Sequence, residues 1–167
     1  RPFAFCYTKM SKRVGQIHLG MGDKWETMYG SIIGVNDEKD GRENVRAWLR
    51  KNEAGESIFL ALYSKHTHKN ETYMNIALPL PYSNMTGILK VCNDSNDLII
   101  TSKLRENSKG DEGIYLHTGF FTIRLPLTEI FIIKEGKGHM LTAHHKMWIF
   151  GVKFLEIDYE IKKIEEK

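Results

Sequence analysis

The feature that most constrains this chain is a two-residue alternation of side-chain character in its last third. In residues 140–149, every second position is apolar apart from one histidine: Leu141, Ala143, His145, Met147 and Ile149. The positions between them include Thr142, His144 and Lys146. After Gly151 the alternation resumes over residues 155–162. Successive side chains of a β-strand point to opposite faces, so this period predicts half-buried antiparallel strands.

The same period recurs upstream of this region. It predicts further strands over residues 31–35, 44–51, 57–63, 72–78, 85–92, 97–105 and 114–118, and residues 120–161 add three or four more. Polar turn residues separate most of these stretches, and no long helical pattern lies between them. The chain is therefore predicted to be mostly β, with about ten antiparallel strands as a barrel or curved sandwich.

The first 30 residues have a different pattern. Phe3, Cys6 and Met10, followed by Val14 and Ile17, recur at three- and four-residue steps, which is helical spacing. Glycines interrupt this segment, so a short helix and a glycine-rich turn are predicted, acting as a lid over one end of the sheet. We expect one β-rich domain over residues 1–167, with the helical lid in 1–30 and the sheet in 31–163.

Charge and composition narrow the class of protein. The net charge of +3 comes from acidic and basic residues that are interspersed, whereas nucleic-acid binders concentrate positive charge on one face. No apolar run approaches the ~20 residues of a membrane-spanning helix. The first residues lack a secretory signal, and Cys6 and Cys92 match no metal or redox spacing. These observations predict a soluble cytoplasmic protein with two free thiols and no nucleic-acid partner.

The seven histidines do not predict a metal site. His144 and His145 are adjacent on one strand and therefore point to opposite faces. His66 and His68 share a face and would form a two-ligand site, which is weak without a third ligand. We therefore expect neither a metal nor another cofactor.

Three polar groups each allow two interpretations. His145, on the apolar parity, is either a core histidine satisfied by one hydrogen bond or a polar contact in a ligand cavity. The acidic row Glu156, Asp158 and Glu160 fits a solvated strand face, with paired carboxylates for glycoside hydrolysis as the alternative. Arginines beside aromatic residues, as in Arg46, Trp48 and Arg50, either form a cross-strand ladder with acidic residues or stack on the aromatic rings and clamp a carboxylate or phosphate.

Large side chains at predicted inward positions lead to a hypothesis about function. They indicate a ligand-sized apolar cavity, since a sheet of eight or more strands can enclose unfilled space. The predicted ligand-binding residues are His145, Tyr159, Met147, Phe121, Tyr63 and Arg124. The first hypothesis is non-catalytic binding of a small apolar or amphipathic ligand. The alternatives are an enzyme that uses His145 as acid or base in the same cavity and a protein-interaction module.

Several short patches of the sequence carry a family resemblance: residues 9–15, 20–30, 46–50 and 113–127, together with the closing stretches 148–151 and 157–159. Together they resemble a bacterial domain of unknown function that is sometimes fused to saccharopine-dehydrogenase-like reductases. The resemblance implies a soluble bacterial protein in which Trp48, Arg50 and Tyr159 occupy recurring positions. It implies no catalytic residue, because that family has no assigned activity.

Overall fold

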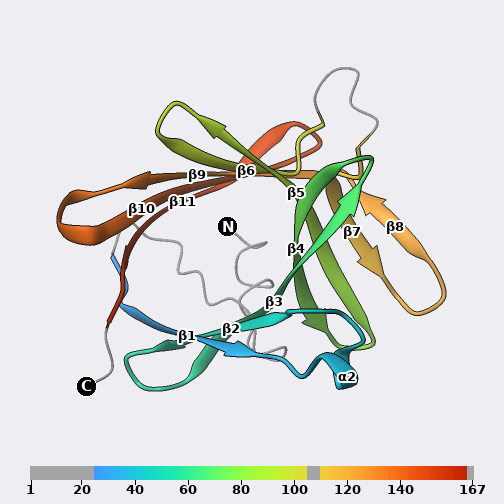
Figure 1. Cartoon of the computed structure of the whole chain (residues 1–167), viewed down its shortest axis with the longest axis horizontal. Helices are drawn as coiled ribbons and strands as arrows, with labels where there is room; N and C mark the ends of the chain where they lie inside the picture. The colour runs from blue at the N-terminus through green and yellow to red at the C-terminus, as the bar shows by residue number, and fades with distance from the viewer. Residues whose placement is uncertain (1–24, 105–109, 165–167) are drawn as a thin grey trace. The chain divides into compact units, whose positions relative to one another are not determined.

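The computed structural model describes residues 25–104 and 110–164 (Figure 1). Its strands are β1 (Met28–Gly34), β2 (Arg46–Asn52), β3 (Ser57–His68), β4 (Glu71–Leu80), β5 (Ser83–Asp94), β6 (Asp97–Thr101), β7 (Gly113–His117), β8 (Thr122–Leu125), β9 (Leu127–Glu135), β10 (Met140–Ile149) and β11 (Val152–Lys162). The short helix α2 (Asp37–Asp40) and the 3₁₀ turn η1 (Lys137–His139) complete the described elements. The prediction of a mostly β, antiparallel chain is confirmed.

Hydrogen bonding links the strands in the order β1-β2-β3-β4-β5-β6-β9-β10-β11, and β7 pairs with β5 and β8. The chain divides into two compact units. Of the described residues, unit 1 contains 25–64 and 76–85, and unit 2 contains 65–75, 86–104 and 110–164. The predicted single domain with a helical lid stays a prediction, since residues 1–24 lie outside the described part. β1 starts at Met28, within the segment predicted to be helical.

Unit 1 is built on the antiparallel strands β1, β2 and β3. Trp48 on β2 lies over Gly30 of β1, where a Cβ atom would come within 2.5 Å of the indole Nε1. The guanidinium of Arg50 sits 4.0 Å from the Trp48 ring centroid and 4.9 Å from that of Phe59. The contact of this cation with two aromatic rings helps to stabilise Arg50 on a half-buried strand face.

The stretch predicted as a polar turn after β1 contains the helix α2. Asn36 caps it, because its side-chain oxygen accepts a hydrogen bond of 3.0 Å from the Lys39 amide. Gly41 ends it in the left-handed conformation, with φ of 82°. A single capped turn carries too few residues for a helical period to show, so the sequence pattern did not predict this helix.

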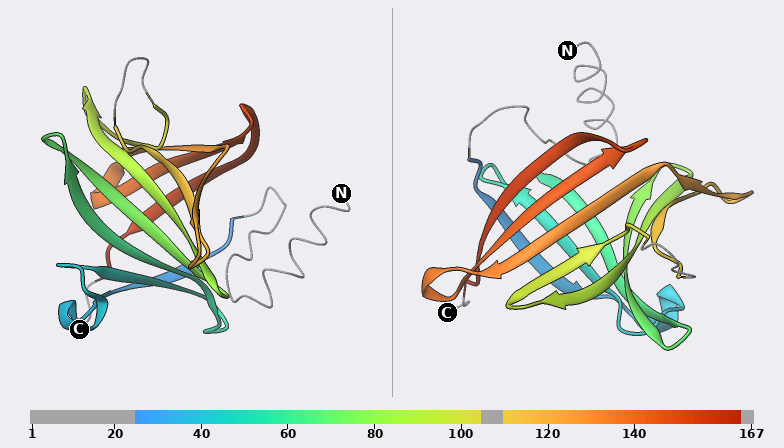
Figure 2. Two further views of the ribbon diagram at one scale, coloured as in Figure 1. Left: turned by 90° about the vertical axis from the view of Figure 1, so that its right-hand side faces the viewer. Right: turned by 90° about the horizontal axis from the view of Figure 1, so that it is seen from above.

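Unit 2 contains four neighbouring antiparallel strands, β6, β9, β10 and β11, and the hairpin of β7 with β8 (Figures 1 and 2). The alternation that predicted strands in the last third is confirmed by β10 and β11, which pair over their whole length with one register shift beyond Met147. The buried apolar side chains of this unit are Tyr73, Leu89, Ile100, Ile114 and Ala143. Ala143 and the half-buried Phe131 belong to the sheet face that also carries His145.

Candidate functional site

A buried hydrogen-bonded pair, Glu129 and His145, lies on the apolar face of β9 and β10. Each residue is only 8% exposed, and His145 Nε2 is 3.1 Å from Glu129 Oε2. A charged group is rarely buried without a partner, since the loss of hydration must be offset. Sequence reasoning placed His145 on this face but missed Glu129, whose signal was a lone carboxylate on the inward parity of an apolar strand.

The backbone of Glu129 is fixed by the segment that ends β6. The Glu129 amide donates to Ser102 Oγ at 2.8 Å, and the Ser102 amide donates to the Glu129 carbonyl at 3.0 Å. Thr101 Oγ1 also donates to that carbonyl at 2.9 Å. On β5, a Cβ atom on Gly87 would come within 2.8 Å of Glu129 Oε1. The absence of a side chain at residue 87 therefore leaves room for the carboxylate.

Aromatic and aliphatic side chains surround the imidazole of His145. The ring of Phe131, its cross-strand neighbour on β9, stacks on it with centroids 3.8 Å apart and 14° between the planes. The ring of Tyr159 on β11 is 6.5 Å away, and Ile157 is directly opposite on the same strand. The site thus combines one polar couple with an apolar wall, which is the usual composition of a small-molecule site.

The second ring nitrogen of His145 is the atom that the protein does not satisfy. His145 Nδ1 is buried and has no hydrogen-bond partner among the described residues. Each of the two interpretations of His145 fits one ring nitrogen. Nε2 has the single hydrogen-bond partner of a core histidine, whereas the unpartnered Nδ1 fits a polar contact with a ligand. When a carboxylate holds the proton on Nε2, the Nδ1 of a neutral imidazole is a hydrogen-bond acceptor.

The other predicted ligand-binding residues of unit 2 divide into two groups. Met147 is half-buried in register with Glu129, and Tyr159 contacts His145, so these lie in the same neighbourhood. Phe121 lies in the turn between β7 and β8 and is 54% exposed. Arg124 on β8 donates from Nη2 to the Glu112 carbonyl at 2.9 Å. Met147 and Tyr159 thus lie near His145, whereas Arg124 hydrogen-bonds to the backbone next to the β7–β8 hairpin.

Tyr63 belongs to unit 1, where its ring lies 5.7 Å from that of Trp48. Arg46 pairs in register with Tyr63 across β2 and β3. The rings of Trp48 on β2 and Tyr63 on β3 thus lie close together, and Arg50 stacks on the ring of Trp48. The structure shows stacking of an arginine on aromatic rings here, which was one element of the sequence interpretation.

His66 and His68 face a common carboxylate in unit 2. Asp111 Oδ2 lies 3.5 Å from His66 Nε2 and 3.4 Å from His68 Nδ1. His66 also contacts Asn75 Oδ1 through Nδ1 at 2.9 Å and stacks on the ring of Tyr73. Within residues 25–104 and 110–164, no group of three or more His, Cys, Asp or Glu side chains is arranged to hold a metal ion.

Tyr73 is a fully buried phenol beside this histidine pair. Its hydroxyl donates to Glu71 Oε2 at 3.1 Å. Burial raises the pKa of Tyr73 to about 12, and the hydrogen bond to Glu71 and the negative charges of Glu112, Glu71 and Asp111 add to the effect. Tyr73 is therefore a neutral hydrogen-bond donor throughout the physiological range.

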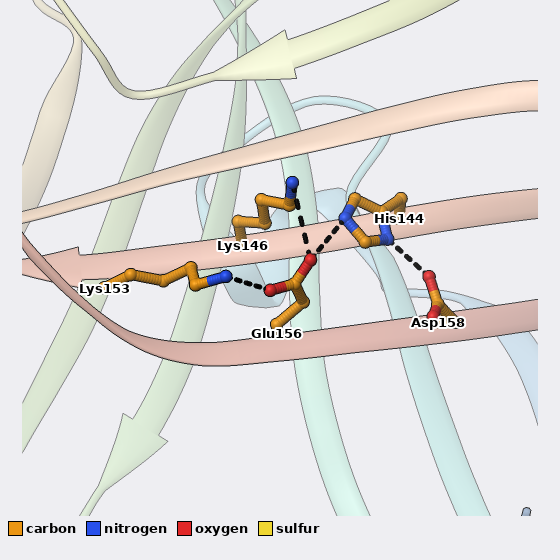
Figure 3. A network of polar contacts seen from close by, with 5 residues as sticks. All are labelled: His144, Lys146, Lys153, Glu156 and Asp158. Carbon is orange, nitrogen blue, oxygen red and sulfur yellow. Dashed lines mark hydrogen bonds and ion pairs between the residues drawn. The ribbon is translucent and has the colours of Figure 1, made fainter.

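The acidic row of β11 forms an exposed network with the outward side chains of β10 (Figure 3). His144 Nε2 lies 2.9 Å from Glu156 Oε1, its Nδ1 contacts Asp158, and Lys146 and Lys153 both contact Glu156. The side-chain hydrogen bond from Lys153 is the main cause that lowers the pKa of Glu156 to about 2. The Glu156 and Asp158 side chains are thus paired on a solvent-accessible face.

Comparison with known proteins identifies a similar sequence but no similar solved structure. No protein-family model matches the chain. No solved structure matches it either. The chain is 51% identical over 166 residues to a Bacillus subtilis protein named "Uncharacterized membrane protein YndJ". That alignment covers 99% of this chain but only 30% of the relative, so the chain spans less than a third of that protein's length.

The name of this relative assigns no activity to it. These comparisons do not bear on the resemblance to the domain fused to saccharopine-dehydrogenase-like reductases, and that link stays a prediction. In the described part of the chain, no helix has the length and apolar character needed to cross a membrane.

Proposed function

We propose that unit 2 binds a small amphipathic molecule against the face of β9, β10 and β11 that carries His145. The observation that supports this most is the buried, unpartnered Nδ1 of His145. A buried polar atom without a partner costs about 1–3 kcal/mol, so native proteins rarely retain one that nothing satisfies. A ligand atom that hydrogen-bonds to Nδ1 would remove this cost on binding.

The surroundings of His145 support an apolar body for the ligand. On β11 the inward side chains of Leu155, Ile157, Tyr159 and Ile161 are only half-buried, although they share a face with buried Ala143 and His145. Apolar surface that the fold leaves partly in contact with water is surface that a hydrophobic ligand would cover. Tyr159 and Met147 would form the wall nearest to the imidazole.

The hydrogen bond between His145 and Glu129 indicates which polar group the ligand carries. In this proposal His145 is neutral and its Nε2–H donates a hydrogen bond to the Glu129 carboxylate, so Nδ1 is a hydrogen-bond acceptor. The complementary group is a hydrogen-bond donor such as an alcohol. A long-chain alcohol is therefore the simplest probe that combines both properties.

The test compares 1-decanol with decyl methyl ether by isothermal titration. The two probes have similar apolar bodies, but the ether cannot donate a hydrogen bond. We expect the alcohol to bind about tenfold more tightly, because one hydrogen bond to an otherwise unsatisfied atom contributes ~1.4 kcal/mol. This preference should disappear in His145→Phe, and the His145 ring nitrogen signals in NMR spectra should shift with decanol in the wild type. Equal affinities of the two probes would show that His145 does not contact the ligand. If neither probe binds, the proposed function is wrong.

A second candidate function is catalysis by the same couple. A carboxylate that fixes the tautomer of a histidine leaves the opposite nitrogen available as a general base. Glu129 and His145 have this relation at 3.1 Å. Hydrolysis of p-nitrophenyl decanoate that is lost in His145→Phe and follows a single titration would favour an enzyme. Binding without turnover would favour the carrier.

The curated relative suggests a cellular setting for this binding activity. That protein is named a membrane protein, and this chain corresponds to 30% of its length. We propose that the chain works as one part of a longer protein associated with a membrane. Membrane fractionation of cells that produce the longer protein tests this. Recovery of this region in the soluble fraction would instead favour the predicted cytoplasmic location.

A further inference from the structure

The turn between β10 and β11 combines two unfavourable properties at one residue, Phe150. Its φ is 49°, in the left-handed region that glycine and asparagine tolerate and bulky side chains avoid. Its ring is also 80% exposed, so the phenyl group is left in water. Neither local backbone preference nor burial within the chain explains a phenylalanine at this position.

The turn is well fixed in spite of this strain. Ile149 and Val152 close it in register, and Phe150 and Gly151 are its two central residues, both with positive φ. Such two-residue turns favour Asn-Gly, because both central residues must adopt left-handed conformations. The Phe150 amide donates to the Pro126 carbonyl at 2.9 Å, which ties the tip to the β8–β9 connection.

The residues around Phe150 make this tip apolar. Ile149, Val152 and Phe154 are all exposed, so the turn presents four apolar side chains from six consecutive residues. A tight turn is convex, and a convex apolar tip suits insertion into a soft apolar layer better than docking against a flat protein surface.

Basic groups stand at the base of this tip. Lys146 and Lys153 flank it, and Figure 3 shows their ammonium groups converging on Glu156. Residues 146–156 contain two lysines and one glutamate, so the formal net charge of this segment is +1. Lysines beside aromatic and aliphatic side chains are the usual arrangement where a protein meets the headgroup region of a bilayer.

We propose that the β10–β11 turn, with Phe150 at its tip, inserts into the interfacial layer of a lipid bilayer. The proposal rests on the membrane association proposed above and adds the element that contacts the lipid. A single apolar turn binds weakly by itself, but a chain held close to a bilayer by the rest of a longer protein has a high effective concentration there. Insertion would place unit 2 at the boundary from which amphipathic molecules can enter it.

Flotation of the 167-residue chain with vesicles of phosphatidylethanolamine and phosphatidylglycerol tests the proposal. The vesicles are used at a high lipid concentration, at which even weak binding by a single turn is measurable. Under these conditions we expect a fraction of the wild-type chain to float with the vesicles and Phe150→Asn to lose about tenfold in partition coefficient, because a phenyl ring no longer leaves water. Asparagine suits the left-handed conformation, so this variant should keep or raise the midpoint of urea unfolding. Loss of lipid binding therefore cannot be attributed to loss of the fold.

Tyr82 provides a matched control in unit 1. It also has a positive φ, 57°, in the two-residue connection between β4 and β5, and it is 99% exposed. Tyr82→Asn should retain wild-type flotation. An equal loss in both variants would show general adhesion of exposed aromatic residues and would overturn the assignment to this turn. It would also be overturned if wild type fails to float, or if Phe150→Asn abolishes self-association and leaves flotation unchanged.

The decanol titration separates this inference from the proposed ligand site. Phe150→Asn should bind decanol as the wild type does, and His145→Phe should float as the wild type does. If flotation fails while decanol binds, only the turn proposal is wrong. If decanol fails while flotation depends on Phe150, the ligand site is wrong and the turn proposal stands.

Discussion

Removing the imidazole of His145 while keeping an aromatic ring tests how the buried couple contributes to stability. In His145→Phe, the new ring can still stack on Phe131, which lies 3.8 Å away between centroids. The carboxylate of Glu129 then remains buried without the donor that faced it at 3.1 Å. The loss therefore reports mainly on an unpaired buried charge and less on a cavity.

The magnitude follows from the burial of both side chains, which are 10% and 11% exposed. Leaving a buried polar group without its hydrogen-bond partner costs about 1–3 kcal/mol, and a buried carboxylate that stays charged costs up to about 5 kcal/mol. Protonation of Glu129 and relaxation toward the space above Gly87 would lower this, so we expect about 2–4 kcal/mol. Glu129→Gln keeps an oxygen that can accept from Nε2 and should cost only about 1 kcal/mol.

The decisive comparison is the double variant Glu129→Leu/His145→Phe. Because both polar partners are gone, it should be more stable than His145→Phe alone, and within about 1 kcal/mol of the wild type. Urea unfolding followed by far-UV circular dichroism measures all four proteins. A His145→Phe loss below about 0.5 kcal/mol, or a double variant that is less stable than His145→Phe, would refute a buried and coupled pair.

Three further predictions concern sites away from this couple. The lowered pKa of Glu156, about 2, means that Glu156→Gln should destabilise the chain near pH 7, and the difference from wild type should vanish as the pH falls from about 4.5 toward 2. The raised pKa of Tyr73, about 12, means that its contribution is complete below pH 10 and lost as the pH rises through 12, so the ultraviolet titration of Tyr73→Phe should lack one high-pH phenol. Gly110→Ala should cost about 1–3 kcal/mol in urea unfolding, because the new Cβ would lie 2.6 Å from the Tyr73 hydroxyl and closer still to the Glu112 carboxylate. Gly34→Ala, where the nearest atom would be 3.8 Å away, is its control and should cost less.

The strands were predictable where one face is buried and the other is wet. In β10 and β11 the inward positions are mostly apolar and the outward ones mostly polar, so the period of two is visible without a structure. The same parity placed His145 correctly on the buried side. Phe121 shows the limit of this reasoning, because it lies in a turn where the strand alternation does not apply, and its ring is exposed.

The partners of the candidate site were not predictable from local patterns. Glu129 is 16 residues from His145, and Ser102 is 27 residues from Glu129, so both contacts depend on which strands become neighbours. Alternation gives the face of a residue on its own strand, but strand order and register decide what stands opposite. A carboxylate on an inward position of β9 was the only local sign that a buried partner must exist.

The contact between Trp48 and Gly30 has a consequence for how the first two strands find each other. Shifting β1 by one residue against β2 would turn its side chains to the other face, and shifting it by two would bring Met28 or Ile32 beneath the indole. Only a residue without a side chain fits there, because a Cβ would meet Nε1 at 2.5 Å. Misaligned pairings are thus penalised by steric overlap as soon as the hairpin begins to close. Gly30 in β1 and Trp48 in β2 together favour the native register of the pairing.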